Sequence, residues 1–269
     1  MSELEPEAVR PLLRGSFGEP YLYLAETTST QDVLRNGDFP HGAVAVAEHQ
    51  TAGRGRSGRR WDGASGAALL FSVLLRPPTP GRGDRLQPVV RAAPLPQLSL
   101  VAGLAVAAAL ESQVAVPALL KWPNDVLVEG RKVAGILLEA SGGTVVCGIG
   151  INVNQEERDL PSETRTPATS LRIASGRTGD RGHLLAAVLE ELEERYRRWL
   201  AGGLAALAVE LEARNALRGR RVRVGGRAGT AGAIAADGRL TIVLDRGDRV
   251  LVESGEVEVV ADGGARTTG

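Results

Sequence analysis

The amino-acid sequence predicts an α+β protein in two parts, a large one over residues 1–216 and a small β-rich one over residues 217–262. In the first part, short apolar runs of strand length are interspersed with longer runs of helix length. From about residue 217, alternating strand patterns follow one another at tight turns instead. The 269 residues suffice to bury a sizeable core, and we expect residues 263–269 to form a disordered tail.

The elements of the large part are predicted in order from caps, periodicity and glycine turns. Ser29 and Thr30 precede an apolar pair, which indicates a capped helix start. A polar loop at residues 50–66 and a Pro-, Gly- and Arg-rich insertion at residues 77–96 interrupt the pattern. Buried or short strands are expected at 43–48, 67–75, 118–120, 126–128, 132–139 and 144–153, and helices at 98–114, 183–200 and 204–216.

The small part consists of closely spaced hairpins. Turn signals recur at Gly225-Gly226, Asp237-Gly238 and Arg246-Gly247-Asp248. Short strands separated this regularly indicate a small antiparallel barrel. The strands are expected at 221–224, 228–235, 240–244, 250–253 and 257–260.

Composition narrows the functional class. The net charge is zero, so no whole-molecule field favours nucleic acid or a membrane surface. The apolar run at residues 98–110 is too short to span a bilayer, and we expect no membrane association. Cys147 is the single cysteine, and the acidic N-terminus lacks a signal-peptide pattern, so we expect a cytoplasmic location. The three histidines show no ligand spacing, which argues against a zinc site.

The two lysines of the chain, Lys121 and Lys132, stand among 32 lysines and arginines. Surface charge and solubility can be met by either residue type, whereas a compact, flexible ammonium requires lysine. Two lysines in one short segment therefore indicate a function there that arginine cannot perform. Their chance survival in an arginine-biased sequence is the alternative.

Residues 53–61 (GRGRSGRRW) match the spacing G-x-G-x-x-G. A dinucleotide fingerprint requires an apolar helix behind the third glycine, and none follows here. Glycines that admit a ligand and guanidiniums that fork onto phosphate or carboxylate oxygens favour a loop for a small anion. Single-stranded nucleic-acid binding and an ordinary solvated charge run are the alternatives.

Three further segments carry candidate chemistry. Residues 121–125 (KWPND) form a rigid turn that can aim an amide and a carboxylate at Mg²⁺-bound phosphates, or an ordinary turn. Residues 131–139 (RKVAGILLE) set Lys132 at the start of an apolar strand. Residues 148–154 (GIGINVN) alternate glycines in a strand, which marks a close approach of backbone or ligand, or plain sheet packing. No P-loop is present in the sequence.

In this order the four segments resemble the biotin protein ligases, whose hallmarks are G-R-G-R-x-G-R-x-W, K-W-P-N-D, K-x-x-G-I-L and G-x-G-x-N. The resemblance implies a mixed sheet flanked by helices, like the catalytic domain of class II aminoacyl-tRNA synthetases, followed by a small SH3-like C-terminal β-barrel. It also implies ATP-dependent formation of biotinyl-5′-AMP, then transfer of biotin to a lysine of a carboxylase's biotin carboxyl carrier domain.

The resemblance implies roles for individual residues. Lys132 brings the carboxylate and triphosphate together, Arg54 and Arg56 hold the adenylate, and Asp125 helps to orient the acceptor lysine. The other residues implied to contact biotin are Ser29, Thr30, Gln50, Gly53, Gly135 and Gly148. Those implied to contact ATP are Arg56, Arg59, Trp61, Asn124, Lys132 and Asn152, and those implied to hold Mg²⁺ are Asn124 and Asp125.

Two rival functions remain open at this point. A lipoate–protein ligase or octanoyltransferase shares the fold and chemistry that the resemblance implies. A non-enzymatic nucleic-acid-binding protein would use the arginine loop and the small barrel, with steeply salt-dependent binding. About 25 residues precede Glu26, too few for the helix-turn-helix domain that some ligases carry, so we expect no specific DNA binding. We expect a monomer or homodimer whose partner is the carrier domain of acetyl-CoA carboxylase or a related carboxylase.

Overall fold

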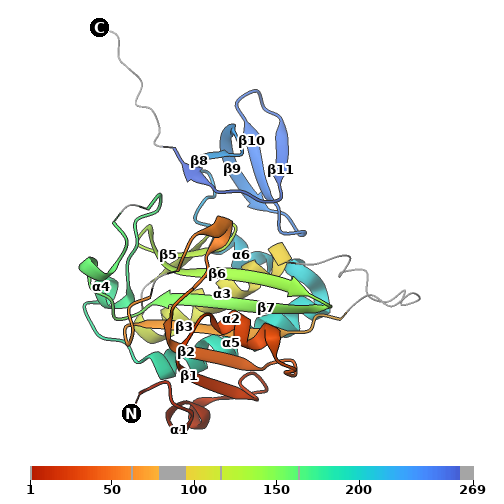
Figure 1. The fold of residues 1–269 in the computed structure, drawn as a ribbon. Coiled ribbons are helices and arrows are strands. Elements are labelled where there is room, and N and C mark those ends of the chain that lie inside the picture. The colour runs from red at the N-terminus through yellow and green to blue at the C-terminus, as the bar shows by residue number, and fades with distance from the viewer. Residues whose placement is uncertain (1, 62, 79–94, 116, 163, 261–269) are drawn as a thin grey trace.

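The computed structural model describes residues 2–61, 63–78, 95–115, 117–162 and 164–260. Most of the 77–96 insertion and the 263–269 tail lie outside these residues. The body is built on a seven-stranded sheet with the strand order β1-β2-β3-β7-β6-β5-β4 (Figure 1). Its strands are β1 (Tyr21–Thr27), β2 (Val44–Gln50), β3 (Ala68–Leu75), β4 (Ala118–Lys121), β5 (Asp125–Val128), β6 (Arg131–Ser141) and β7 (Thr144–Asn152).

The sheet is mixed, as expected. Strands β1 and β2 pair in parallel, and the remaining neighbours pair antiparallel. All eight residues of β3 are buried, because helices cover the sheet on both faces. The parallel pair needs a crossover, and α2 (Thr30–Asn36), with Ser29 as its N-cap residue, provides it.

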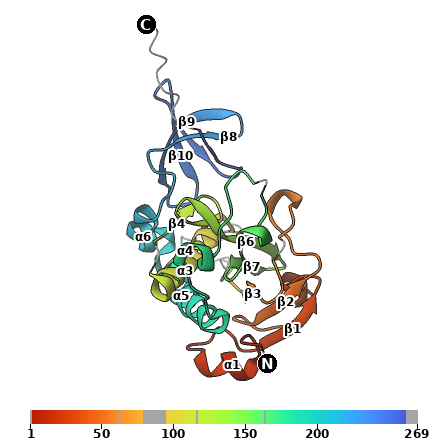
Figure 2. The ribbon, with the colours of Figure 1, turned by 90° about the vertical axis from the view of Figure 1, so that its left-hand side faces the viewer.

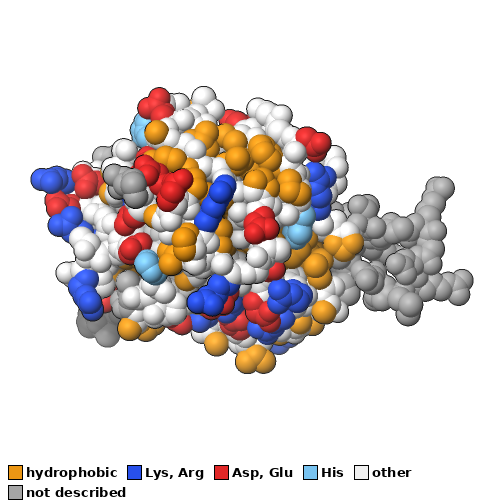
Figure 3. All heavy atoms as spheres, turned by 90° about the horizontal axis from the view of Figure 1, so that it is seen from below, with side chains coloured by type: hydrophobic (Ala, Val, Ile, Leu, Met, Phe, Trp, Pro, Cys, Tyr) orange, Lys and Arg blue, Asp and Glu red, His pale blue; other side chains and the backbone are white. Residues whose placement is uncertain are grey.

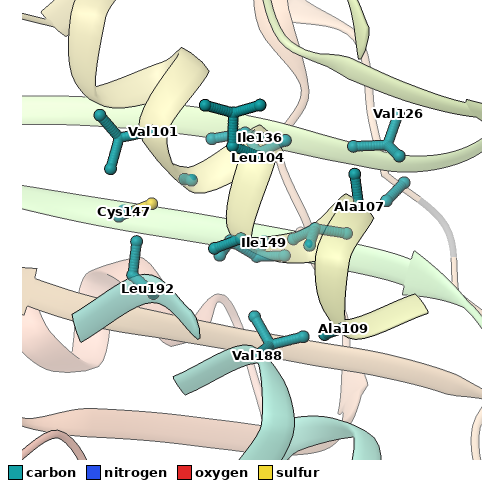
Figure 4. Packing of buried hydrophobic residues seen from close by; sticks show 14 of the residues in the cluster. Val101, Leu104, Ala107, Ala109, Val126, Ile136, Cys147, Ile149, Val188 and Leu192 are labelled. Carbon is teal, nitrogen blue, oxygen red and sulfur yellow. The ribbon is translucent and has the colours of Figure 1, made fainter. Parts of the chain in front are cut away.

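Helix α2 covers one face of the sheet and two long helices cover the other. Leu34 of α2 joins a small apolar cluster with β2, β3 and β7. On the opposite face α3 (Leu95–Val114) packs against β4 to β7 and against α5 (Arg181–Gly202). Figure 4 shows Val101 and Leu104 of α3 beside Ile136 and Ile149 of the sheet. The pocket lies on the α2 face, and this core supports the sheet beneath it.

Helix α3 corrects one expectation from the sequence. The helix runs through 20 residues rather than the 13 of its most apolar stretch, and residues 95–113 are long and apolar enough to cross a membrane. However, 67% of that window is buried inside the protein. Its apolar composition is therefore explained by its position between the sheet and α5.

The remaining helices are short and lie near the N-terminus, in loops, or between α5 and the C-terminal sheet. Helix α1 (Pro6–Val9), with the 3₁₀ helix η1 (Arg10–Leu12), buries Val9 against the body near the N-terminus (Figure 1). The 3₁₀ helices η2 (Arg56–Gly58) and η3 (Glu157–Asp159) lie in loops, and α4 (Leu171–Ser175) follows β7. After α5 the chain passes through η4 (Gly203–Leu207) and α6 (Ala208–Ala213) into the C-terminal sheet.

The C-terminal sheet has five antiparallel strands in the order β11-β10-β9-β8-β12. They are β8 (Arg221–Val224), β9 (Arg227–Ile234), β10 (Leu240–Leu244), β11 (Arg249–Val252) and β12 (Glu258–Val259). The predicted strands are present, but the described pairings leave β11 and β12 as two edges, so the sheet is not a closed barrel. Trp122 of the body fixes it by donating its Nε1–H to the Gly238 carbonyl oxygen at 2.9 Å.

Candidate active site

A pocket of about 210 Å³ opens where the large sheet, the 54–61 loop and the C-terminal sheet meet. Of the residues predicted to form the site, Gly53 is the one that does not line it. The pocket is lined by thirteen others, namely Ser29, Thr30, Gln50, Arg54, Arg56, Arg59, Trp61, Asn124, Asp125, Lys132, Gly135, Gly148 and Asn152. The pocket thus brings together residues from Ser29 to Asn152, and the role of each one stays a prediction.

One end of the pocket is neutral and polar. At the start of α2, Thr30 donates its backbone N–H to Gln50 Oε1 at 2.7 Å. The Thr30 hydroxyl lies 2.7 Å from Ser72 Oγ, and the buried Ser29 is adjacent. Next to them Gln31 donates its amide N–H to the Leu137 carbonyl oxygen at 3.2 Å, over the backbone of Gly148. This end offers amides and hydroxyls to a neutral polar ligand group.

The pocket floor, which we define as Gly135, Gly150 and the Trp61 indole, is closely packed. Gly135 and Gly150 are partners across β6 and β7. A Cβ at Gly135 would lie 2.8 Å from Trp61 Cζ3, and one at Gly150 would overlap the same ring. The glycines thus admit the large Trp61 side chain, whereas the sequence predicted an approach of backbone or ligand, or plain sheet packing. The Trp61 Nε1–H is buried without a hydrogen-bond partner.

Lys132 lines the pocket beside Asp125 and the Trp61 ring. Its Nζ is 2.6 Å from Asp125 Oδ1 and 5.3 Å from the centre of the Trp61 ring. Its backbone is held on both sides, because Lys132 N–H donates to the Pro167 carbonyl oxygen at 2.7 Å and its own carbonyl accepts from Thr169 N–H at 2.8 Å. A compact ammonium is thus fixed at the start of β6.

Asn152 supports the same segment. Its side-chain amide donates to the Thr169 carbonyl oxygen at 2.9 Å, while Gln155 donates to Asn152 Oδ1 at 3.1 Å. Both ends of the Asn152 amide are therefore engaged within the protein. In this structure Asn152 connects β7 with the backbone that flanks Lys132.

Two arginines of the 54–61 loop, Arg54 and Arg56, have different kinds of partner. Arg54 is bound by carboxylates, donating to Asp32 Oδ2 at 2.8 Å and to both oxygens of Glu139 at 3.0 Å. The Arg54 hydrogen bond lowers the pKa of Asp32. Arg56 instead donates to Asn124 Oδ1 at 3.3 Å, inside the pocket. Arg54 therefore anchors the loop, and Arg56 is the better placed of the two to contact a ligand.

The lining is strongly cationic although the whole chain is neutral. Seven arginines and lysines and two carboxylates line the pocket. Burial lowers the pKa of Lys121 and of Arg56, because removing a cation from water disfavours its charged form. On the face opposite the C-terminal sheet, by contrast, acidic and basic side chains are interspersed (Figure 3). The excess of cations in the pocket favours a polyanionic ligand.

Several lining residues escaped the sequence prediction. Gly150 belongs to the predicted segment at residues 148–154, and Gln31 directly follows the predicted Ser29 and Thr30. Lys121, whose Nζ lies 2.5 Å from Thr166 Oγ1, was singled out without a role. Arg165 and Glu256 belong to loops without a recognisable motif, so the sequence alone offered no signal for them.

The model of the biotin/lipoate A/B protein ligase family matches residues 22–156, which contain the four motifs. The chain belongs to this family. It is 41% identical over 250 residues to the biotin--[acetyl-CoA-carboxylase] ligase of Mycobacterium tuberculosis, a match that covers 87% of this chain and 86% of that one. It is 39% identical over 185 residues to the bifunctional ligase/repressor BirA of Bacillus subtilis, covering 67% of this chain and 54% of the relative.

The fold agrees with solved structures of the family. The biotin protein ligase from Aquifex aeolicus in complex with biotin and ATP is 33% identical and superimposes with a TM-score of 0.77, covering 90% of this chain and 98% of that one. The apo structure of the same ligase gives a TM-score of 0.72 at 30% identity. The large mixed sheet with helices on both faces is thus the family's architecture.

Proposed function

We propose that this chain is a biotin–protein ligase. It forms biotinyl-5′-AMP from biotin and ATP, then transfers the biotinyl group to a lysine of a biotin carboxyl carrier domain. The proposal is carried by a pocket that combines neutral polar groups at Ser29 and Thr30 with the cations of the 54–61 loop and the Lys132 ammonium. The names of the relatives support it.

In the first half-reaction an oxygen of the biotin carboxylate attacks the α-phosphorus of ATP. A new P–O bond forms, and the bond to pyrophosphate breaks. Carboxylate and triphosphate repel each other, so a cation must approach both and stabilise the charge of the in-line transition state. We assign this to Lys132, whose small ammonium fits beside the Asp125 carboxylate at 2.6 Å. Arg56, rather than the anchored Arg54, holds the phosphate of the adenylate.

In the second half-reaction the carrier lysine attacks the acyl carbon of the mixed anhydride. The C–N bond forms, the C–O bond to AMP breaks, and the lysine loses a proton. Asp125, which lines the pocket at the start of β5, is the carboxylate suited to orient the incoming amine. Water must be excluded meanwhile, since the anhydride is hydrolysable, and the 54–61 loop forms the cover.

Mg²⁺ is proposed as the metal. Asn124 would give its amide oxygen and Asp125 its carboxylate to an ion that takes its remaining ligands from phosphates and water. Each group would then exchange the cation that it contacts in the free protein, Arg56 at 3.3 Å and Lys132 at 2.6 Å. Among the described residues no group of three His, Cys, Asp or Glu could hold a metal without the nucleotide. Bound there, Mg²⁺ would neutralise phosphate charge.

The finer structural and cellular expectations are part of the proposal. We propose that the five-stranded C-terminal sheet is an SH3-like module covering residues 217–262. A cytoplasmic location, a monomeric or homodimeric state and the lack of specific DNA binding remain predictions of the sequence.

The test is formation of the acyl-adenylate and its transfer. The protein is incubated with ATP, Mg²⁺ and either biotin or lipoate, and mass spectrometry follows acyl-AMP and the mass of an added biotin carboxyl carrier domain. We expect biotinyl-AMP and a carrier heavier by one biotinyl group. Product with lipoate alone would assign the protein to the lipoate branch, which the family description also covers.

A further inference from the structure

Three segments from distant parts of the chain meet at the pocket rim, which we define as Arg59, Arg165 and Glu256. Arg59 Nη2 lies 2.6 Å from Glu256 Oε1, and Arg165 Nη1 lies 2.6 Å from Glu256 Oε2. Glu256 comes from the connection between β11 and β12, and Arg165 precedes α4. Figure 2 shows the segment before α4 rising toward the lower end of the C-terminal sheet. All three side chains line the pocket.

Glu256 supplies negative charge where the pocket lacks it. The other carboxylate in the described lining, Asp125, is paired with Lys132. Each oxygen of Glu256 faces a different guanidinium, an arrangement that a phosphate group with its several oxygens could reproduce. The nearby cations Lys121 and Arg56 also experience the Glu256 charge, which raises their pKa against the effect of burial.

The rim contacts are exchangeable. The side chains of Arg59 and Arg165 are 58% and 69% exposed, and that of Glu256 is 35% exposed. Exposed ion pairs are weak because water and salt screen them. A polyphosphate carries more charge than one carboxylate and can therefore replace it.

We propose that Arg165 joins Arg59, which is already expected to contact ATP, in one subsite for the polyphosphate of ATP and for pyrophosphate, and that Glu256 is a built-in competitor occupying this subsite in the free protein. This inference rests on the proposed function for its ligand. When polyphosphate enters, Glu256 leaves, and the contact between the 54–61 loop and the C-terminal sheet is lost. The sheet stays attached through Trp122 and Gly238, so the effect is a local loosening at residues 255–259.

The test compares Glu256→Gln with Glu258→Gln. Glu258 is a matched control, because it lies two residues away, is exposed, and pairs at 3.7 Å with Arg223 rather than with the pocket. Calorimetry at fixed ionic strength measures the affinity of each protein for inorganic pyrophosphate. We expect Glu256→Gln to bind about two- to fivefold more tightly, the range that one exposed ion pair allows. Arg165→Gln should bind more weakly, and Glu258→Gln as the unchanged protein does.

The same variants are tested in biotin-dependent pyrophosphate exchange. Glu256→Gln should lower KM for ATP by the same factor and leave KM for biotin unchanged. Equal or weaker pyrophosphate binding by Glu256→Gln would overturn the inference, as would an equal gain in Glu258→Gln. If the unchanged protein catalyses no exchange but the binding differences appear, the proposed function fails and the subsite stands. If exchange is normal and Glu256→Gln changes neither the affinity for pyrophosphate nor KM for ATP, the subsite claim fails.

Discussion

The floor and the rim of the pocket are built in opposite ways. The pocket floor consists of two cross-strand glycines filled by one indole, with a buried core beneath it. The pocket rim consists of three partly exposed charged side chains from three segments. Packing determines the floor before any ligand arrives, whereas the rim is held by charges that a ligand can replace. We therefore expect the floor to keep its arrangement when a ligand binds, and the rim to rearrange when the nucleotide binds.

The largest effect is expected at the junction of the two regions. Lys132→Arg keeps the positive charge but brings a wider group beside Asp125, where Nζ now lies 2.6 Å from Oδ1. We expect adenylate formation to fall about 100- to 1000-fold, the cost of losing one preorganised transition-state contact. Single-turnover formation of biotinyl-AMP measures it. Near-normal turnover would show that the lysine is not specifically required.

A change at the floor should be next in size. In Gly150→Val the new side chain would overlap the Trp61 ring, so the indole must move away from Gly135 and Gly150. We expect the free energy of unfolding to fall by about 1–3 kcal/mol, as overpacking does, together with weaker nucleotide binding. Denaturant titration and calorimetry measure the two quantities. Ala140→Val, at an exposed site of the neighbouring strand β6, is the control and should change neither.

The anchor of the 54–61 loop should have a smaller effect. The hydrogen bond from Arg54 lowers the pKa of Asp32, so this pair stabilises the fold fully above the unfolded value of about 4 and less as pH falls through the folded value. Asp32→Asn removes the contribution, less than about 1 kcal/mol, at neutral pH. Because the loop then loses one of its contacts, we expect faster hydrogen exchange at residues 54–61 in Asp32→Asn than in the unchanged protein. The control Asp38→Asn, at an exposed position, should leave the exchange of residues 54–61 unchanged. An equal rise in that variant would show that the Arg54–Asp32 pair does not anchor the loop.

The smallest effect is expected when a thiol reagent is added to the folded protein. Its target would be Cys147, which lies in β7, the strand that also carries Gly150 of the floor. The residue is fully buried, and burial raises its thiol pKa to about 12. A thiol reagent at pH 8 should therefore not label the folded protein, and labelling should follow unfolding. Rapid labelling of the folded protein would mean that the sheet beneath the floor opens readily.

Much of the large sheet could be predicted because its strands are strongly patterned. The apolar runs between glycine turns predicted β6 and β7 to within two residues at each end. The polar residues from Ser29 predicted the start of α2, although the Ser29 side chain makes no capping hydrogen bond. Strand β1 and the short helices α1 and α4 were not predicted, since their burial depends on tertiary partners such as α5 rather than on local periodicity. Closure of the C-terminal barrel was predicted and is not observed in the described strand pairings.

The site divides in the same way. The residues of the four motifs were predicted because the motifs, taken together and in order, resemble those of a known family. The different tasks of Arg54 and Arg56 were not, since only the fold brings Asp32 and Glu139 to one guanidinium and not to the other. Arg165 and Glu256 reach the pocket from loops of no distinctive composition. Motifs thus identified Gly135 and Trp61 of the floor and Arg59 of the rim, while long-range contacts brought Arg165 and Glu256 to the rim.

The most direct test of the central claim is exchange of labelled pyrophosphate into ATP, with biotin and lipoate in parallel and with and without Mg²⁺. Exchange requires a pocket that binds the carboxylate and the nucleotide together and activates one with the other. The account predicts exchange with biotin in the presence of Mg²⁺ and none with lipoate. A folded protein that catalyses no exchange with biotin would contradict it.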